Sequence, residues 1–329
     1  MKPFDRRSFL RVTGASLGFG ALYSVLPTTA SGAVVEMLDH MGKMTGERMK
    51  PFTFFQLSDT HVGFTGAPNP TGTKAFERAV EVLNTLAAPP DLVLFTGDLS
   101  HDSEDKDVHA GRMKQFKDIA SQIKTKNLRY VPGEHDAGLD EGILYREHFG
   151  ETSYSFDMNG VHFVALDNVS RARPEVGADR IAWLKKDLAR FHKFTPIVVF
   201  THRPLFDLKP EWEWFTSDGD DVMNVLAPFE NVTVLYGHIH RDDDHTEGHV
   251  HHHAARSLMF SFPDPAKVAD KKPNPFDKEH PFTNLGIKQI HADPKKTKAN
   301  SISLEDVELS LREFSGTEGI QQILKTGEL

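Results

Sequence analysis

The sequence predicts an α/β protein, and three observations support this fold class. Short apolar runs rich in β-preferring residues, such as 52–58 and 91–96, alternate with longer segments whose apolar residues recur at helical spacing. These segments follow the order β-α-β-α-β-ββ-α-β-α-β, and their inner strands are continuously hydrophobic. The chain has 329 residues, of which 39% are hydrophobic and 26% are charged. It is therefore long enough and apolar enough for a large core.

The individual elements follow from local patterns. Helices are predicted where apolar residues fall on one face, and a hairpin is predicted around the turn Asn159-Gly160. Residues 267–280 are rich in Lys, Pro and Asp and are predicted to form a loop, and the last dozen residues form a short helix or a tail. The predicted strands are 52–58, 91–96, 128–132, 154–158, 161–166, 196–201, 232–236, 285–291 and 301–309; the predicted helices are 74–88, 108–124 and 178–192.

The first 33 residues have the three-part pattern of an export signal. Arg6, Arg7 and Arg11 precede a mildly apolar stretch over 12–26, and small residues follow at 30–33. The string Asp-Arg-Arg-Ser-Phe-Leu resembles a twin-arginine signal; the alternative is a chance basic segment before a buried helix. We expect export by the twin-arginine machinery to the periplasm, and no membrane span in the mature chain. The expected organisation is signal 1–33, linker 34–51, main domain 52–262 and a C-terminal extension 263–329 that packs on the same domain.

Composition excludes several classes of site. The chain has no cysteine, which rules out disulfides, thiolate zinc sites, iron–sulfur clusters and a cysteine nucleophile. It has 18 histidines, so a transition metal must be held by imidazole and carboxylate groups. The net charge is −9, and it becomes about −12 when 1–33, with four positive charges and one negative, is removed. Such an acidic chain is not expected to bind nucleic acid stably.

Polar residues follow five of the buried strands. They occur in the strings Asp59-Thr60-His61, Gly97-Asp98, Gly133-Glu134-His135-Asp136, His202 and Gly237-His238-Ile239-His240. A single Asp or His at a strand end is usually a cap or a turn former. Five such segments in order are not expected by chance, and ligands of open α/β sheets bind outside the carboxyl ends of strands. In an extended turn, residues i and i+2 point the same way, so each pair can reach one ion or two adjacent ions. We expect the glycines to allow sharp turns there.

The ordered set of motifs resembles the calcineurin-like metallophosphoesterases, and most closely the bacterial cyclic-nucleotide phosphodiesterase-like members, over about 52–262. The resemblance implies a four-layer α/β/β/α sandwich with two mixed sheets flanked by helices. It also implies a dinuclear centre of two transition metal ions (Fe, Mn or Zn) at the strand ends. Two such ions clamp a phosphate and lower the pKa of a bridging water. The implied roles are Asp59, His61 and His240 on the first metal, Asp98 as a bridge, Glu134, His202 and His238 on the second metal, and His135 near the leaving group, oriented by Asp136.

Glu134 departs from the family pattern, which usually has Asn at this position. Glutamate can still ligate a metal, but its charge should weaken the Lewis acidity of the second metal and repel a phosphate. Three interpretations stay open: a tuned phosphoesterase with a different metal preference, a metal-binding protein with weak or lost hydrolysis, or a proton-transfer role for Glu134.

Three further features of the sequence can each be interpreted in more than one way. The segment 242–253 is rich in Asp and His. It is either an auxiliary metal site, a metal-loading loop or a support for the ligands of the main centre, or it is a solvated polar loop, with His253 beginning the next strand. The aromatic segment 211–215 either caps the crevice or packs in the core or against another subunit. Arg203 either contacts a substrate phosphate or pairs with a surface carboxylate, and His101 and His109 are candidates for substrate contacts.

These expectations lead to one functional hypothesis and one rival. The hypothesis is an exported, dinuclear metal-dependent phosphoesterase that hydrolyses phosphodiester or phosphomonoester bonds of a small molecule through a metal-bridged hydroxide. The rival is a periplasmic metal-binding protein on the same fold that is non-catalytic or weakly catalytic. Glu134 and the His-rich segment are the reasons to consider it.

Overall fold

The computed structural model describes residues 51–125, 127–293 and 303–310. The expected signal 1–33 and the last dozen residues lie outside these ranges. Within the described residues, no helix combines the length and the apolar character needed to cross a membrane.

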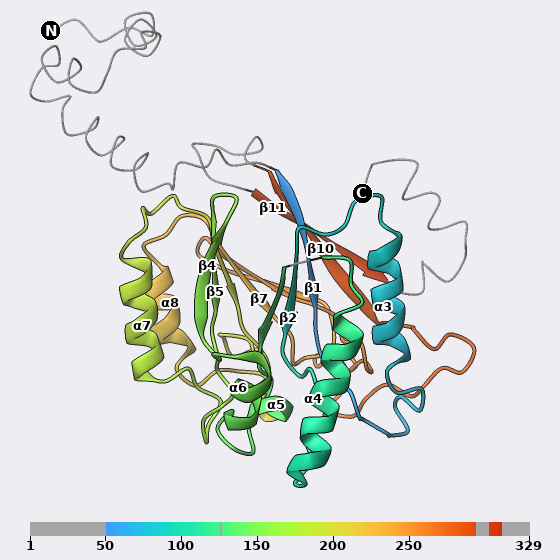
Figure 1. Ribbon diagram of the computed structural model, residues 1–329. Coiled ribbons are helices and arrows are strands. Elements are labelled where there is room, and N and C mark those ends of the chain that lie inside the picture. The colour runs from blue at the N-terminus through green and yellow to red at the C-terminus, as the bar shows by residue number, and fades with distance from the viewer. Residues whose placement is uncertain (1–50, 126, 294–302, 311–329) are drawn as a thin grey trace, which may run out of the picture. The chain divides into compact units, whose positions relative to one another are not determined.

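Two mixed β-sheets form the centre of the molecule (Figure 1). One has five strands in the order β11-β10-β1-β2-β3, and the other has six in the order β4-β5-β6-β7-β9-β8. In the six-stranded sheet β5, β6, β7 and β9 are parallel, and the edge strands β4 and β8 are antiparallel to them. In the five-stranded sheet β1, β2 and β3 are parallel, and β10 and β11 are added beside β1 in antiparallel pairing. The strands are β1 Phe52–Leu57, β2 Leu92–Thr96, β3 Leu128–Val131, β4 Tyr154–Met158, β5 Val161–Ala165, β6 Ile197–Phe200, β7 Val232–Tyr236, β8 Asp243–Glu247, β9 Val250–Ala254, β10 Gly286–Asp293 and β11 Ser303–Ser310.

The two sheets pack face to face through alternate side chains of their strands. Phe54 of β1 belongs to the same buried cluster as Phe163 of β5 and Phe200 of β6, and the rings of Phe54 and Phe163 meet edge to face at 5.4 Å. The intervening residues point the other way: Phe55 and Leu57 contribute to a second cluster on the outer face of the first sheet. Strands that are buried on both faces explain the continuously apolar runs in the sequence.

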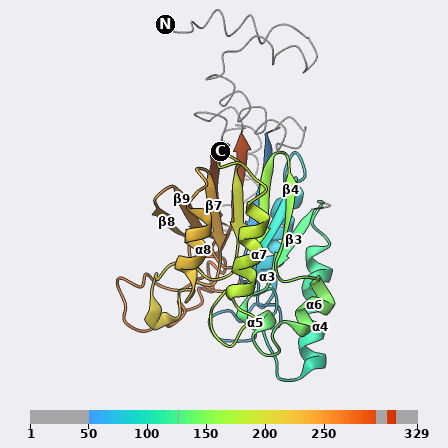
Figure 2. The same ribbon diagram turned by 90° about the vertical axis from the view of Figure 1, so that its left-hand side faces the viewer.

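Helices cover the outer faces of both sheets (Figures 1 and 2). Those on the first sheet share a buried cluster with β1 and β2, and those on the second share one with β6 and β7. The result is an α/β/β/α sandwich, as the family resemblance implied. The helices are α3 Lys74–Thr85, α4 Lys106–Ala120, α5 Glu134–Ala137, α6 Ile143–Phe149, α7 Ala178–Leu188 and α8 Gly219–Leu226, with a 3₁₀ turn η1 at Pro210–Trp212.

The histidine-rich segment is a β-hairpin, and the expectation of a solvated loop is wrong there. Strands β8 and β9 pair in register with His245 opposite His252, joined at Gly248 and His249. Val250, His252 and Ala254 alternate inward, so the segment has the period of a strand. His252 is fully buried, and both its ring nitrogens lack a hydrogen-bond partner among the described residues. The ring lies against those of Phe206 and His245.

The aromatic segment packs in the core. The side chains of Trp212 and Trp214 are 3% and 0% exposed and belong to one cluster with Tyr236. The two indole rings meet edge to face at 4.8 Å. Core packing, one of the alternatives for this segment, is therefore what the structure shows.

Candidate metal centre

Five strand ends of the two sheets deliver the predicted site residues to one place. Asp59 and His61 follow β1, and Asp98 follows β2 of the same sheet. Glu134 begins α5, just after β3. His202 follows β6, and His238 and His240 follow β7 of the second sheet. Among the described residues, four overlapping groups of side chains could hold a metal ion, and His135 takes part in two of them, once together with His101. The other two are a first ligand group of Asp59, His61, Asp98 and His240 and a second ligand group of Glu134, His202 and His238.

Asp98 lies between the two groups. Its Oδ2 atom is 3.4 Å from His61 Nε2 in the first group and 3.4 Å from His202 Nε2 in the second. Its other oxygen, Oδ1, accepts a hydrogen bond from the backbone N–H of His135 at 3.0 Å. Asp98 is 1% exposed, so it is fixed in a position from which one carboxylate oxygen faces both groups.

Unusual backbone angles occur at these ligand positions. Asp59, His61, Asp98, His238 and His240 all have positive φ values, between 39° and 67°. Positive φ is uncommon for residues other than glycine and is costly, so it persists where surrounding structure enforces it. The expectation that the pairs Asp59/His61 and His238/His240 sit in extended turns is therefore wrong. Both members of each pair are in the left-handed region, and they reach the site by turning the chain sharply.

Two glycines serve the site in different ways. Gly97 has a φ of 94°, which fits the expected sharp turn before Asp98. Gly237 does not have a positive φ. A Cβ atom there would collide with Ser58 Oγ and crowd a carboxylate oxygen of Asp59. Gly237 therefore allows the end of β7 to lie close to the end of β1. The prediction that it allows a sharp turn is wrong.

Three of the histidines are oriented by backbone carbonyls. Nδ1 of His202 lies 2.7 Å from Thr96 O, Nδ1 of His240 lies 2.8 Å from Phe260 O, and Nε2 of His238 lies 3.1 Å from Glu213 O. A nitrogen that donates to a carbonyl leaves the opposite nitrogen directed at the site, which is the usual arrangement of histidine metal ligands. Glu213 directly follows η1 and was not anticipated, because its contribution is a backbone atom presented by a residue with a φ of 61°.

The donor set fits a pair of metal ions. The Nε2 atoms of His61 and His240 lie 3.1 Å apart, and Nδ1 of His61 is buried with no hydrogen-bond partner in the described ranges. Burial lowers the pKa of His61 well below its usual value and that of His238 to about 4, so both rings are neutral at pH 7 and offer a lone pair. For His202, the carboxylates of Asp98 and Glu134 outweigh burial and raise its pKa. A proton on Nε2 of His202 lies between the imidazole and these carboxylates, where a metal ion would bind. Imidazole and carboxylate ligands of this kind suit zinc, iron or manganese.

His135 is held by Asp102, and the prediction that Asp136 orients it is wrong. Nδ1 of His135 lies 2.5 Å from Asp102 Oδ1. Burial lowers the pKa of His135, but the charges of Asp98, Asp102 and Glu134 outweigh it and raise this pKa to about 9. Asp136 is buried and instead accepts hydrogen bonds from three backbone N–H groups and one hydroxyl group around it. The donors are Leu99 N, Ser100 N, Ser100 Oγ and Gly133 N.

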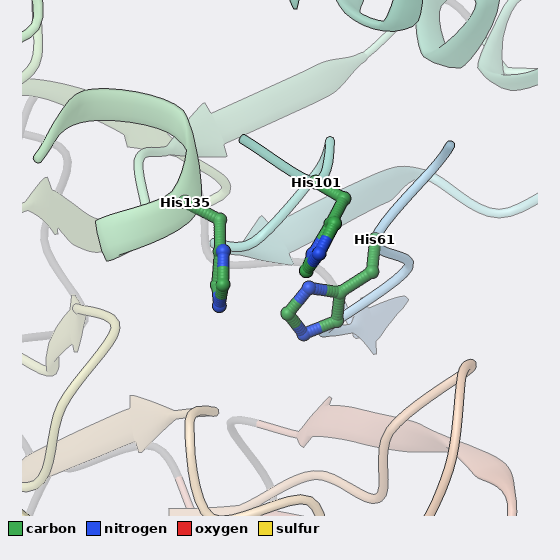
Figure 3. Close-up of side chains that lie close together, drawn as sticks. All are labelled: His61, His101 and His135. Carbon is green, nitrogen blue, oxygen red and sulfur yellow. The ribbon is translucent and has the colours of Figure 1, made fainter. Parts of the chain in front are cut away.

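Of the further candidates, His101 is at the site, and His109 interacts with the backbone of His135. Figure 3 shows His101, His61 and His135 together, with the ring of His101 beside that of His135. The two rings stack at 4.6 Å with an angle of 27°. His109 instead lies on the buried stripe of α4 that includes Met113, so its helix directs it to the interior. Arg203 is buried near Glu134, with Nη2 at 3.5 Å from its Oε1 atom.

Comparisons with known proteins agree with this geometry. Residues 52–242 match the calcineurin-like phosphoesterase family. A probable glycerophosphodiester phosphodiesterase of Arcobacter nitrofigilis is 25% identical over 202 residues, which cover 56% of this chain and 71% of the relative. A 3′,5′-cyclic-nucleotide phosphodiesterase of Nostoc sp. is 21% identical over 222 residues, 64% of this chain and 80% of the relative.

Solved structures show the same fold at low sequence identity. A dimetal phosphatase from Danio rerio superposes with a TM-score of 0.54 at 13% identity, covering 79% of this chain and 99% of that one. A purple acid phosphatase from yellow lupin has a TM-score of 0.54 at 14% identity, covering 80% of this chain and 52% of that one.

Proposed function

Because the chain belongs to the calcineurin-like phosphoesterase family of metal-dependent hydrolases, we propose that it hydrolyses phosphodiester or phosphomonoester bonds of a small molecule with two bound metal ions. The observation that carries this proposal is the position of Asp98 Oδ2, 3.4 Å from a histidine of each ligand group. When bound, the ions would supply charge stabilisation and an activated water. The first would be held by Asp59, His61 and His240, the second by Glu134, His202 and His238, with Asp98 between them.

His135 would supply the proton or the hydrogen bond that the reaction needs in addition to the metal ions. Asp102 occupies its Nδ1 atom, and the charges of Asp98, Asp102 and Glu134 outweigh burial and raise the pKa of the ring to about 9, which leaves Nε2 for a substrate oxygen. In that role His135 donates a proton to the leaving group or a hydrogen bond to the developing charge. The ring of His101 lies along one face of His135, and that of His61 meets it edge to face at 4.8 Å. Both contacts restrict how the imidazole can turn.

A reconstitution assay tests this function. Metal-free protein is loaded with Mn, Fe, Zn or Co, its metal content is measured, and it is assayed on bis-p-nitrophenyl phosphate and p-nitrophenyl phosphate. We expect about two ions per chain and turnover of at least one substrate. Two bound ions without turnover of either substrate would instead support the rival function, a metal-binding protein without hydrolysis.

Glu134 is the residue that suggests the rival function, because its carboxylate lies inside the second ligand group. Glu134→Asn separates the two functions. If the glutamate suppresses hydrolysis, the Asn variant gains activity; if it serves this enzyme's own chemistry, the variant loses activity while still binding metal.

The proposal includes export by the twin-arginine route, supported by the string around Arg6 and Arg7. The test is to replace both with lysine and follow the chain between cytoplasm and periplasm. Retention of the double-lysine variant in the cytoplasm is the expected result, and unchanged distribution would contradict it.

A further inference from the structure

Arg203 is a buried cation inside the candidate metal centre. Its side chain is 10% exposed, Nη1 donates to Glu213 O at 2.8 Å, and Nε has no partner among the described residues. A guanidinium stays charged in proteins, and burying it is costly unless an anion neutralises it. In the part of the chain that the structure describes, the carboxylate within 4.0 Å of Arg203 is that of Glu134.

Glu134 faces the second ligand group with both its oxygens. Oε1 lies 2.8 Å from His238 Nδ1, and Oε2 lies 2.8 Å from His202 Nε2. Arg203 Nη2 lies 3.5 Å from the same Oε1 atom. Arg203 and His238 also share the carbonyl oxygen of Glu213, at 2.8 Å and 3.1 Å. The guanidinium therefore contacts one proposed ligand directly and shares a carbonyl with another.

The charges of the pair cancel. An Asn at position 134, which is usual in the family, would contribute no charge. Glu134 contributes one negative charge beside the second metal position. Arg203 contributes one positive charge at the same place. We propose, on the basis of the function proposed above, that Arg203 is a positioning residue that neutralises Glu134 and restores the electrostatic balance an Asn would give, instead of clamping the substrate phosphate.

Charge balance and phosphate clamping predict different effects of Arg203→Met. If Arg203 balances Glu134, its loss leaves a bare carboxylate, so the second metal binds more tightly and a phosphate anion binds more weakly, each by about tenfold or more. If Arg203 clamps phosphate, metal affinity without phosphate stays unchanged and only phosphate binding weakens. If its role is merely structural, both affinities fall.

The experiment is a double-mutant cycle measured by calorimetry. Mn²⁺ is titrated into the metal-free forms of the wild type, Arg203→Met, Glu134→Asn and the double variant. Orthophosphate is then titrated into each Mn²⁺-loaded form. We expect Arg203→Met to strengthen Mn²⁺ binding and weaken phosphate binding, and Glu134→Asn to do the reverse. Both affinities of the double variant should return to within about threefold of the wild-type values. A double variant that stays as weak for phosphate as Arg203→Met overturns the proposal.

Arg241→Met is the matched control. Arg241 directly follows the proposed ligand His240, as Arg203 follows His202, but it pairs with Asp264 at 3.3 Å. The control removes the same charge and should leave both affinities within about twofold of the wild type. Equal effects of Arg203→Met and Arg241→Met would overturn the proposal. A wild type that binds fewer than two Mn²⁺ ions would refute the proposed dinuclear function itself, and this inference with it.

Discussion

The Nδ1 atom of His135 lies 2.5 Å from Oδ1 of Asp102, and this contact joins the start of α5 to the loop after β2. The hydrogen bond from His135 also lowers the pKa of Asp102, to about 2. The pair is thus a charged carboxylate behind a protonated imidazole. Asp102→Asn should lower kcat by about 10- to 100-fold, because the ring loses the partner that fixes its orientation and its charge. The measurement is steady-state kinetics on bis-p-nitrophenyl phosphate, with metal content unchanged.

Asp136→Asn provides the contrast to that variant. Asp136 accepts four hydrogen bonds from the backbone and hydroxyl groups around it, so its loss should reduce the free energy of unfolding by about 1–3 kcal/mol. Urea denaturation measures this loss. Equal losses of kcat in the two variants, with equal stabilities, would contradict the assignment of Asp102 as the orienting residue.

Removal of the metal ions should destabilise the fold, because the ligands lie at the ends of strands from both sheets. At metal concentrations about 100 times the Kd, we expect the metal to raise the melting temperature by roughly 5–10 °C. Asp98→Ala should abolish this increase and metal binding at both positions. Asp244→Ala, on the exposed side of the β8–β9 hairpin, is the control and should keep the full increase. Unchanged metal stoichiometry in Asp98→Ala would refute its bridging position.

His252 should make the fold sensitive to acid. Burial lowers its pKa from 6.5 to about 3, so between these pH values the unfolded chain binds more protons than the folded chain. The contribution of His252 to stability is therefore complete above about pH 6.5 and falls by up to roughly 1.4 kcal/mol per pH unit as the pH decreases toward 3. His252→Phe should remove this dependence.

The measurement for His252 is urea unfolding of metal-free wild type and His252→Phe between pH 7.5 and 4.5. The stability of the variant relative to the wild type should increase steadily as the pH falls. His251→Phe, at an exposed position of the same strand, should show no such trend. A constant difference between wild type and His252→Phe across this range would contradict the prediction.

Gly237→Ala should disrupt the first ligand group. The added Cβ collides with Ser58 Oγ and presses on the carboxylate of Asp59, so we expect loss of one metal ion and a destabilisation of about 1–3 kcal/mol. Metal analysis and urea denaturation measure the two effects. Gly111→Ala is the control: it lies in α4 with no atom near the new Cβ and should stabilise the chain by about 0.5–1 kcal/mol. Full metal content in Gly237→Ala would show that the site tolerates the contact.

The predicted site residues that the structure brings together share one property: they closely follow a buried apolar strand. Asp59, Asp98 and His202 are of this kind, and parallel strands bring such residues to one edge. Asp102 has no such signal, because its contact with His135 depends on where α5 places the ring. Glu213 takes part through a backbone carbonyl, which no residue type predicts. The β8–β9 hairpin did carry a signal, the alternation of Val250, His252 and Ala254 after Gly248, but histidines at inward positions obscured it.

The pairing of β1 on both sides has a consequence for the order of synthesis. Phe54 pairs with Leu92 of β2 on one side and with Ile290 of β10 on the other. While a ribosome is still translating the intervening segments, β1 has an open edge with unpaired backbone groups. Asp59 and His61 follow this strand directly. We therefore expect the candidate metal centre to be complete only after β10 has been translated, even though its first proposed ligands are translated early.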